Sequence, residues 1–343
     1  MDYRNLGRTG VPVSMLCLGC MNFGIETPEA DSMTIIDRAL DAGINFLDTA
    51  NVYGRGASET VVGKALKRNG QRDRIVLATK VHGRMADDDP LAAGSSRRHI
   101  IAQCEASLKR LQTDYIDLYQ LHRSQHDIPI DETLRALDDL VRAGKVRYIG
   151  TSNFPAWRIM ESLWVAKELG LNRVISEQPP YHLLDRSIER ELIPLARSYG
   201  LAVMPWSPLA RGFLSGKYQR GEPVPGDSRF ARDGQAPPPF ARRRDQHFSD
   251  LAYNLLDVVT ALADEKGCTP SQVAVAWNAH QPGITSPIIG PRTMAHLEDY
   301  LGALEVTITD EDRARLDEAA PPEHAIVPYY TGTILDFGPS KYR

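Results

Sequence analysis

Short apolar runs alternate with longer amphipathic stretches along most of the chain. Eight of the runs have the length of a β-strand, at residues 15–19, 44–48, 74–80, 115–122, 146–150, 173–177, 201–206 and 285–290. The stretches between them carry apolar residues at helical spacing, for example Ile100, Cys104, Leu108 and Leu111. Strands that alternate with helices of roughly 10–15 residues are typical of βαβ units around a parallel sheet.

Helix boundaries can also be recognised along the chain. Thr27 followed by Pro28 predicts an N-cap with proline in the first turn, and Gly43 predicts the end of that helix. Gly144 and Gly170 likewise predict the end of a helix just before a later strand. We therefore expect a helix between each pair of successive strands and another after the eighth.

Right-handed crossovers leave two ways to arrange eight such units, an open doubly wound sheet or a closed barrel. The open sheet of dinucleotide-binding proteins carries G-x-G-x-x-G after an early strand, and the nearest string, at residues 54–59, lacks the third glycine. Eight βα units in about 300 residues therefore predict an α/β fold of the (β/α)8 TIM-barrel type, with a short N-terminal β-hairpin. We expect a single domain over residues 1–343, because no linker divides the chain.

Two segments do not follow this alternation of predicted strands and helices. Residues 209–248 are rich in Gly and Pro and lie between the seventh strand and a predicted helix near 250–266. Loops of such length inside a compact domain are usually functional lids or disordered segments. We expect a lid-like loop here and a C-terminal tail over residues 320–343.

Composition and charge narrow the range of functions. The chain has 343 residues, of which 42% are hydrophobic and 24% charged, as in ordinary globular proteins. Its formal charge is only −4, which argues against a nucleic-acid partner. Apolar runs are too short for a membrane span, and the first ten residues lack the apolar segment of a signal peptide. The expected location is the cytoplasm.

Four cysteines are too few for a disulfide framework in a chain of this length. Cys17 and Cys20 form a C-x-x-C pair, but they lie in an apolar, strand-like stretch where side chains three apart point to opposite faces. The pattern favours a structural role over a redox or zinc site, and no metal site is predicted.

Polar side chains end three consecutive predicted strands. Asp48 ends the second strand, Lys80 the third and His122 the fourth, while Tyr53 lies five residues beyond Asp48. The carboxyl ends of barrel strands carry the chemistry of this fold, and neighbouring strands are about 5 Å apart. We therefore expect these four side chains to converge.

Such a group suits proton donation to a carbonyl oxygen. The pKa of tyrosine is about 10, and a nearby Lys80 ammonium, held by Asp48, is expected to lower the pKa of Tyr53. His122 is expected to bind the substrate oxygen and stabilise developing negative charge. No strong nucleophile is present, so the group suits assistance to a hydride donor. Each residue also has a structural alternative, as an ion-pair partner, a packing residue or a core histidine.

Six segments carry a more specific signal. They are DTANVYGRGASE (48–59), LYQLHR (118–123), GKVRYIGTSNF (144–154), EQPPYHLL (177–184), PWSPLARGFLSGKY (205–218) and PIIGPRTMAHLEDYLGAL (287–304). Together they resemble the aldo-keto reductase family, in its order, from about residue 3 to 304. In texture the chain is similar to the bacterial branch related to potassium-channel β subunits. The resemblance implies a (β/α)8 barrel that binds NADPH across the strand ends without a Rossmann motif.

The resemblance also implies roles for individual residues. Four match the catalytic tetrad, with the tyrosine as acid/base: Asp48, Tyr53, Lys80 and His122. Besides Asp48, those matching the nicotinamide end of the cofactor site are Gly19, Cys20, Met21, Ser152, Asn153, Gln178 and Trp206. Those matching the pyrophosphate segment and its lid are Ser207, Pro208, Leu209, Arg211, Lys217 and Arg229. Those matching the 2′-phosphate and adenine segment are Gly290, Arg292, His296, Asp299 and Tyr300, where the family commonly has Gln and Asn at positions 296 and 300.

The function that this resemblance predicts is NADPH-dependent reduction of an aldehyde or ketone to an alcohol, with Tyr53 as the proton donor. The substrate is expected to be a small carbonyl compound; a keto sugar, an aldehyde and a dicarbonyl all remain open, as does the oligomeric state. The RSQHDIP stretch after His122 departs from the family's usual short acidic turn, at the rim of the substrate site. An alternative is an NADPH-binding regulatory or redox-sensing subunit with slow turnover, as in channel β subunits. The intact tetrad favours the enzyme.

Overall fold

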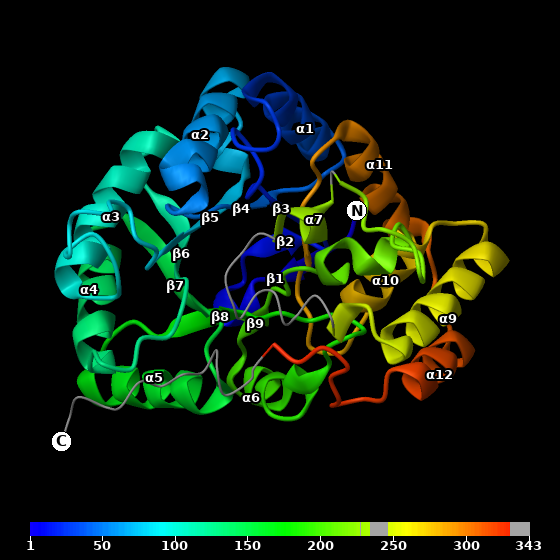
Figure 1. The fold of residues 1–343 in the computed structure, drawn as a ribbon. Coiled ribbons are helices and arrows are strands. Elements are labelled where there is room, and N and C mark those ends of the chain that lie inside the picture. Colours follow the sequence, from blue (N-terminus) through cyan, green and yellow to red (C-terminus); the bar gives the residue numbers. More distant parts are fainter. Residues whose placement is uncertain (227, 234–245, 330–343) are drawn as a thin grey trace.

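The structure of the protein is a computed structural model, and it describes all residues except 227, 234–245 and 330–343. A sheet of eight parallel strands lies at its centre, with helices outside (Figure 1). The strands are β3 (Cys17–Gly19), β4 (Phe46–Asp48), β5 (Val76–Val81), β6 (Ile116–Leu121), β7 (Val146–Ser152), β8 (Val174–Gln178), β9 (Ala202–Val203) and β10 (Ile288–Ile289). Their order in the sheet is β10-β3-β4-β5-β6-β7-β8-β9, so that neighbours in sequence are neighbours in space.

The two outer strands of this order also meet. Trp206 and Ile288 form a parallel bridge, and the Ile288 N–H donates a hydrogen bond to the Pro205 carbonyl at 2.7 Å. Every observed strand overlaps its predicted range, and the predicted (β/α)8 barrel is confirmed. The single-domain assignment over 1–343 stays a prediction.

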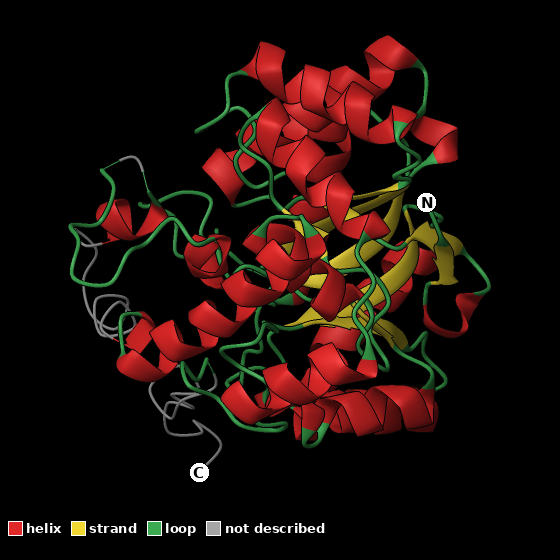
Figure 2. Cartoon of the chain, turned by 90° about the vertical axis from the view of Figure 1, so that its right-hand side faces the viewer, coloured by secondary structure: helices red, strands yellow, loops and turns green. Residues whose placement is uncertain are grey.

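One helix follows each of the strands from β3 to β8 and packs on the outside of the sheet, so the helices form an outer layer (Figure 2). These helices are α1 (Glu29–Asp41), α2 (Ala57–Asn69), α3 (Arg97–Leu111), α4 (Ile130–Arg142), α5 (Ala156–Leu169) and α6 (Leu192–Tyr199). After β10 come α11 (Met294–Gly302) and α12 (Asp310–Ala319). The helical spacing noted in the sequence faces the sheet, because Ile100, Cys104, Leu108 and Leu111 are all buried in α3.

The connection from β9 to β10 is longer and contains more helix than expected. It holds α7 (Arg229–Asp233), α9 (Asp250–Lys266) and α10 (Pro270–Ala279), besides the 3-10 helix η5 (Ala210–Ser215). The predicted loop over 209–248 is therefore partly helical, and its residues 227 and 234–245 lie outside the described chain. The other 3-10 helices are η1 (Gly7–Thr9), η2 (Tyr53–Gly56), η3 (Arg72–Arg74), η4 (Ser187–Glu189) and η6 (Ala303–Glu305).

The expected N-terminal hairpin pairs β1 (Tyr3–Asn5) with β2 (Pro12–Ser14) in antiparallel fashion. It closes the amino end of the barrel, because Leu6 and Val13 are fully buried with the apolar side chains that point into the barrel. In Figure 1 the hairpin lies in blue at the centre of the ring. Gly7 makes this close approach possible, since a Cβ atom there would lie 2.7 Å from the Gly200 carbonyl oxygen.

Strand alternation separates the two cysteines of the C-x-x-C pair. Cys17 packs in the barrel interior, whereas Cys20 packs in the layer between sheet and helices. Both thiols are free. The separation is the one that strand geometry predicts for side chains three residues apart.

The predicted N-cap at Thr27 is wrong. Helix α1 has Pro28 as its N-cap residue and no side-chain cap. The Thr27 hydroxyl instead donates to the Arg292 backbone carbonyl at 3.0 Å, so it ties the loop after β3 to the loop after β10. Within the described residues, no helix is long and apolar enough to cross a membrane.

Candidate active site

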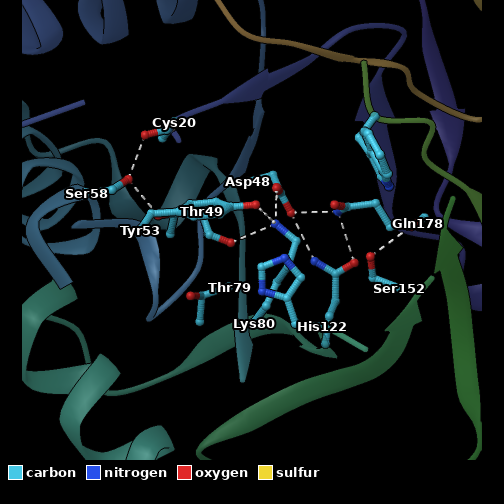
Figure 3. A network of polar contacts seen from close by, with 12 residues as sticks. Cys20, Asp48, Thr49, Tyr53, Ser58, Thr79, Lys80, His122, Ser152 and Gln178 are labelled. Carbon is cyan, nitrogen blue, oxygen red and sulfur yellow. Dashed lines mark hydrogen bonds and ion pairs between the residues drawn. The ribbon is translucent and has the colours of Figure 1, made fainter. Parts of the chain in front are cut away.

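The four residues predicted to converge do so at the carboxyl ends of β4, β5 and β6 (Figure 3). Lys80 is fully buried, and its ammonium contacts the Asp48 carboxylate, the Thr49 carbonyl at 2.9 Å and the Tyr53 hydroxyl at 3.3 Å. All three ammonium protons therefore have acceptors. The rings of Tyr53 and His122 meet edge to face, with centroids 5.6 Å apart.

The second oxygen of Asp48 is held from across the barrel. Its Oδ2 accepts hydrogen bonds from Gln120 Nε2 at 3.0 Å and from Gln178 Nε2 at 2.9 Å. The two amides also bond to each other at 3.2 Å, which links β4, β6 and β8 through the interior. A buried carboxylate with an ammonium and two amide donors is fully satisfied, so Asp48 can fix the position of Lys80.

Burial and charge compete for the protonation of Lys80 and Tyr53. Burial by itself would lower the pKa of Lys80, but Asp48 and Tyr53 outweigh it and raise that pKa. Burial likewise raises the pKa of Tyr53 above its ordinary value, and the nearby Lys80 charge offsets this only in part. Lys80 thus acts in the expected direction, but the expected net lowering of the tyrosine pKa is wrong. Tyr53 is a protonated phenol at neutral pH.

Two imidazoles beside this group are neutral. Burial, Lys80 and Arg123 lower the pKa of His122 well below its ordinary value. Burial, Arg123 and His99 lower the pKa of His82 to about 4, against a smaller opposite effect of Asp127. A neutral imidazole keeps one N–H, so each ring can donate one hydrogen bond.

A cavity of about 790 Å³ opens over the strand ends. All the predicted site residues line it except two: Lys80, which lies beneath Tyr53, and Cys20. The Cys20 side chain points into the outer layer, where burial raises the pKa of its thiol, so only its backbone can serve the cavity. Successive residues of a strand face opposite sides, so Gly19 and Met21 face the cavity whereas Cys20, which lies between them, faces the helices.

The cavity wall contains backbone in the left-handed region. Asn153 has φ +59°, and its amide donates to the His122 carbonyl at 3.1 Å and accepts from Trp206 Nε1 at 3.2 Å. Ser207 and Arg211 have φ +62° and +63°, and the Ser207 hydroxyl accepts the Arg211 N–H at 2.9 Å. Such conformations in residues other than glycine are uncommon and gather at functional sites.

Four further cationic side chains line the cavity. They are Arg211 and Lys217 from the segment after β9, Arg229 from α7, and Arg292 from the loop after β10. Arg292 lies 3.7 Å from Glu26 Oε2, and both side chains are partly exposed. These cations make the cavity suitable for phosphate groups.

Comparison with known proteins identifies the family of this chain. The sequence profile of the Aldo/keto reductase family matches residues 15–321. The chain belongs to this family. Membership supports an oxidoreductase that acts on carbonyl groups of small molecules, and aldo/keto reductases typically use nicotinamide cofactors.

Three relatives of this aldo/keto reductase illustrate the range of the family. The uncharacterized oxidoreductase YrpG of Bacillus subtilis (strain 168) is 41% identical over 333 residues, which are 94% of this chain and 96% of YrpG. Versiconal hemiacetal acetate reductase of Aspergillus parasiticus is 36% identical over 94% of this chain and 98% of its own. A probable voltage-gated potassium channel subunit beta of Arabidopsis thaliana is 36% identical over 89% of this chain and 92% of its own.

Several residues of the site were not identified from the sequence. Gln120 carries the Asp48 network, and strand parity with His122 was the signal for it. His82 and Glu26 line the cavity without any pattern that marks them. Tyr329, in the tail, meets Trp206 edge to face at 5.0 Å, and its N–H donates to Asp185 Oδ2 at 2.6 Å.

Proposed function

We propose that this aldo/keto reductase uses NADPH to reduce an aldehyde or ketone to the alcohol, with Tyr53 as the proton donor. The observation that carries the proposal is the Tyr53 hydroxyl, 3.3 Å from the buried Lys80 ammonium and beside the neutral His122 in one cavity.

The cavity is compatible with an extended dinucleotide. Its lining includes both Tyr53 and Arg292, together with the cations Arg211, Lys217 and Arg229. Lys217, Arg211 and Arg229 would hold the pyrophosphate, while Trp206 and Asn153, joined by their hydrogen bond, would hold the nicotinamide end. Bound there, NADPH supplies the hydride that the carbonyl carbon accepts.

The protein residues handle the oxygen of the substrate. The Tyr53 hydroxyl donates its proton to the carbonyl oxygen as negative charge develops there, and Lys80 stabilises the phenolate that results. His122 directs its remaining N–H towards the same oxygen. Asp48 keeps Lys80 charged and in place, because its carboxylate is bound by Lys80 and by two glutamine amides.

Arg292 supports NADPH rather than NADH as the cofactor. Its guanidinium lines the part of the cavity that the family resemblance assigns to the adenosine 2′-phosphate. Only NADPH carries that phosphate, and a charge-assisted hydrogen bond to it is worth about 1.5–3 kcal/mol. His296, Asp299 and Tyr300 line the same end and are proposed to contact the adenosine.

A second candidate function is a slow NADPH-binding sensor. The relative described as a potassium channel subunit beta favours it, because it aligns with 89% of this chain. Both functions need the same tetrad, so they differ only in the number of turnovers.

A steady-state assay separates the two functions. Excess NADPH and 4-nitrobenzaldehyde are mixed with the protein, and absorbance at 340 nm is followed beyond one equivalent of enzyme. Many turnovers per site are expected for the reductase. A single burst of about one equivalent supports the sensor, and no oxidation with any of a panel of carbonyl compounds overturns both.

A further inference from the structure

A guanidinium group that is not assigned to the cofactor stands beside the tetrad in the cavity. Arg123 directly follows His122 at the end of β6, lines the cavity and is exposed to solvent. Across the part of the chain that the structure describes, its side chain makes no hydrogen bond and no ion pair. The positive charge is therefore available to a molecule that enters the cavity beside the tetrad.

Neutral hydrogen-bond donors surround this charge. Arg123 is close enough to both His82 and His122 to lower the pKa of each, and both rings are neutral. A neutral imidazole offers an N–H without adding charge.

The carboxylates of the cavity lie elsewhere or are engaged. Asp48 is bound by Lys80 and two amides. At the adenosine end, Glu26 pairs with Arg292, and Asp299 accepts a hydrogen bond from the hydroxyl of Thr269, the N-cap residue of α10. Asp127 acts on His82 from the loop after β6, but it is not among the residues that line the cavity. Arg123 therefore faces no unengaged carboxylate among the described residues that line the cavity beside the tetrad.

We propose that the substrate carries a carboxylate close to its carbonyl group, and that Arg123 binds this carboxylate. This proposal rests on the proposed reductase function and narrows its substrate class to carboxylated aldehydes and keto acids. The planar guanidinium matches a carboxylate with two parallel hydrogen bonds. Because Arg123 directly follows His122, its guanidinium would lie near the substrate's carbonyl group. It would bind the carboxylate there, whereas Tyr53 donates the proton.

The test uses pairs of aldehydes that have the same shape and differ in charge. In 4-carboxybenzaldehyde and 4-nitrobenzaldehyde the substituents are both planar and of similar size, and only the first is anionic; the 3-substituted pair tests the distance. kcat and KM are measured with saturating NADPH for the wild type, Arg123→Gln and Arg123→Lys. Arg98→Gln is the matched control, because Arg98 is an exposed arginine at the start of α3, outside the cavity.

The ratio of kcat/KM for the carboxylated to the nitro aldehyde is expected to fall about five- to tenfold in Arg123→Gln, mainly through KM. Arg123→Lys should retain part of the ratio and Arg98→Gln all of it. Added NaCl should reduce the wild-type ratio, because salt screens exposed charges.

The outcomes separate this proposal from the one on which it rests. If every aldehyde is reduced and the ratio is the same in Arg123→Gln as in the wild type, the carboxylate site is wrong and the reductase stands. An equal fall in Arg98→Gln also overturns the site, since the effect is then one of overall charge. If the wild type reduces none of the aldehydes, both proposals fail together.

Discussion

At the scale of single residues, burial and local charge act against each other in this site. Lys80 keeps its charge although it is fully buried, because Asp48 outweighs the cost of desolvation. Lys80 offsets the effect of burial on Tyr53 only in part, and no anionic group offsets it on His122, so burial dominates and both remain neutral. The result is one fixed cation beneath two neutral donors, which suits a reaction in which negative charge develops on an oxygen.

Tyr53→Phe tests the proton donor, since it removes the hydroxyl and keeps the ring. We expect kcat for 4-nitrobenzaldehyde to fall by about 10²–10⁴, the usual contribution of general acid catalysis. The affinity for NADPH should barely change, as measured by quenching of tryptophan fluorescence. Near-normal turnover in this variant would show that another group delivers the proton.

The buried carboxyl of Glu177 predicts a stability that depends on pH. Burial raises its pKa from 4.5 to about 8, against hydrogen bonds from Thr151 and the Phe154 N–H. The folded protein then holds a proton that the unfolded chain releases. The free energy of unfolding therefore falls as the pH rises from about 4.5 to 8, by at most about 1.4 kcal/mol per pH unit from this group.

Glu177→Gln removes this titration and keeps a hydrogen-bond acceptor for Phe154. Relative to the wild type, it is expected to be more stable at pH 8, with the difference shrinking towards pH 5. Urea unfolding at several pH values measures the difference directly. A difference that stays constant from pH 5 to pH 8 would mean that Glu177 does not titrate in this range.

At the scale of elements, the ends of neighbouring strands are tied together by the loops that follow them. Asn153, after β7, bonds both to the carbonyl after β6 and to Trp206 after β9. These bonds hold its backbone at φ +59°. The cavity wall is therefore shaped by side chains that bridge loops, and not by the strands alone.

Two substitutions at this position separate backbone strain from lost hydrogen bonds. Asn153→Gly and Asn153→Ala both remove the side-chain bonds, so each should weaken NADPH binding by about tenfold. Asn153→Ala should also be less stable than Asn153→Gly by about 1 kcal/mol, because alanine is strained in the left-handed region. Fluorescence titration and urea unfolding give the two quantities, and equal stability of the variants would contradict the strain.

At the scale of the whole molecule, the cavity joins segments from both ends of the chain. The loop after β3 contacts the loop after β10 through the Thr27 hydrogen bond and the Glu26–Arg292 ion pair. Closure of the barrel brings these loops together, although they are far apart in sequence. The contact lies where the cofactor's 2′-phosphate is proposed to bind, so Glu26 competes with that phosphate for Arg292.

Cofactor preference follows from this competition. Arg292→Ala is expected to weaken NADPH binding by about ten- to a hundredfold and to leave NADH unchanged. Glu26→Gln should strengthen NADPH binding by a few-fold. The control is Glu29→Gln, which removes the ion pair between Glu29 on α1 and Lys64 on α2 and should have no effect on NADPH binding. Fluorescence titrations with both cofactors decide the matter; equal losses for NADPH and NADH in Arg292→Ala would contradict the assignment.

The sequence by itself determined the order of strands and helices and the residues that end each strand. Asp48, Lys80 and His122 could be placed at adjacent strand ends because alternation and helical spacing are local properties of the chain. The resemblance to the family then supplied roles for residues that no local pattern distinguishes, such as Trp206 and Arg292.

Only the tertiary structure decided how these residues act on one another. Gln120 and Gln178 reach Asp48 from across the barrel, Thr27 turns from its helix to Arg292, and burial reverses the expected shift of the Tyr53 pKa. Each of these depends on barrel closure, on strand register or on the exclusion of water. Such properties arise from contacts between segments far apart in the chain, and periodicity along one segment carries no information about them.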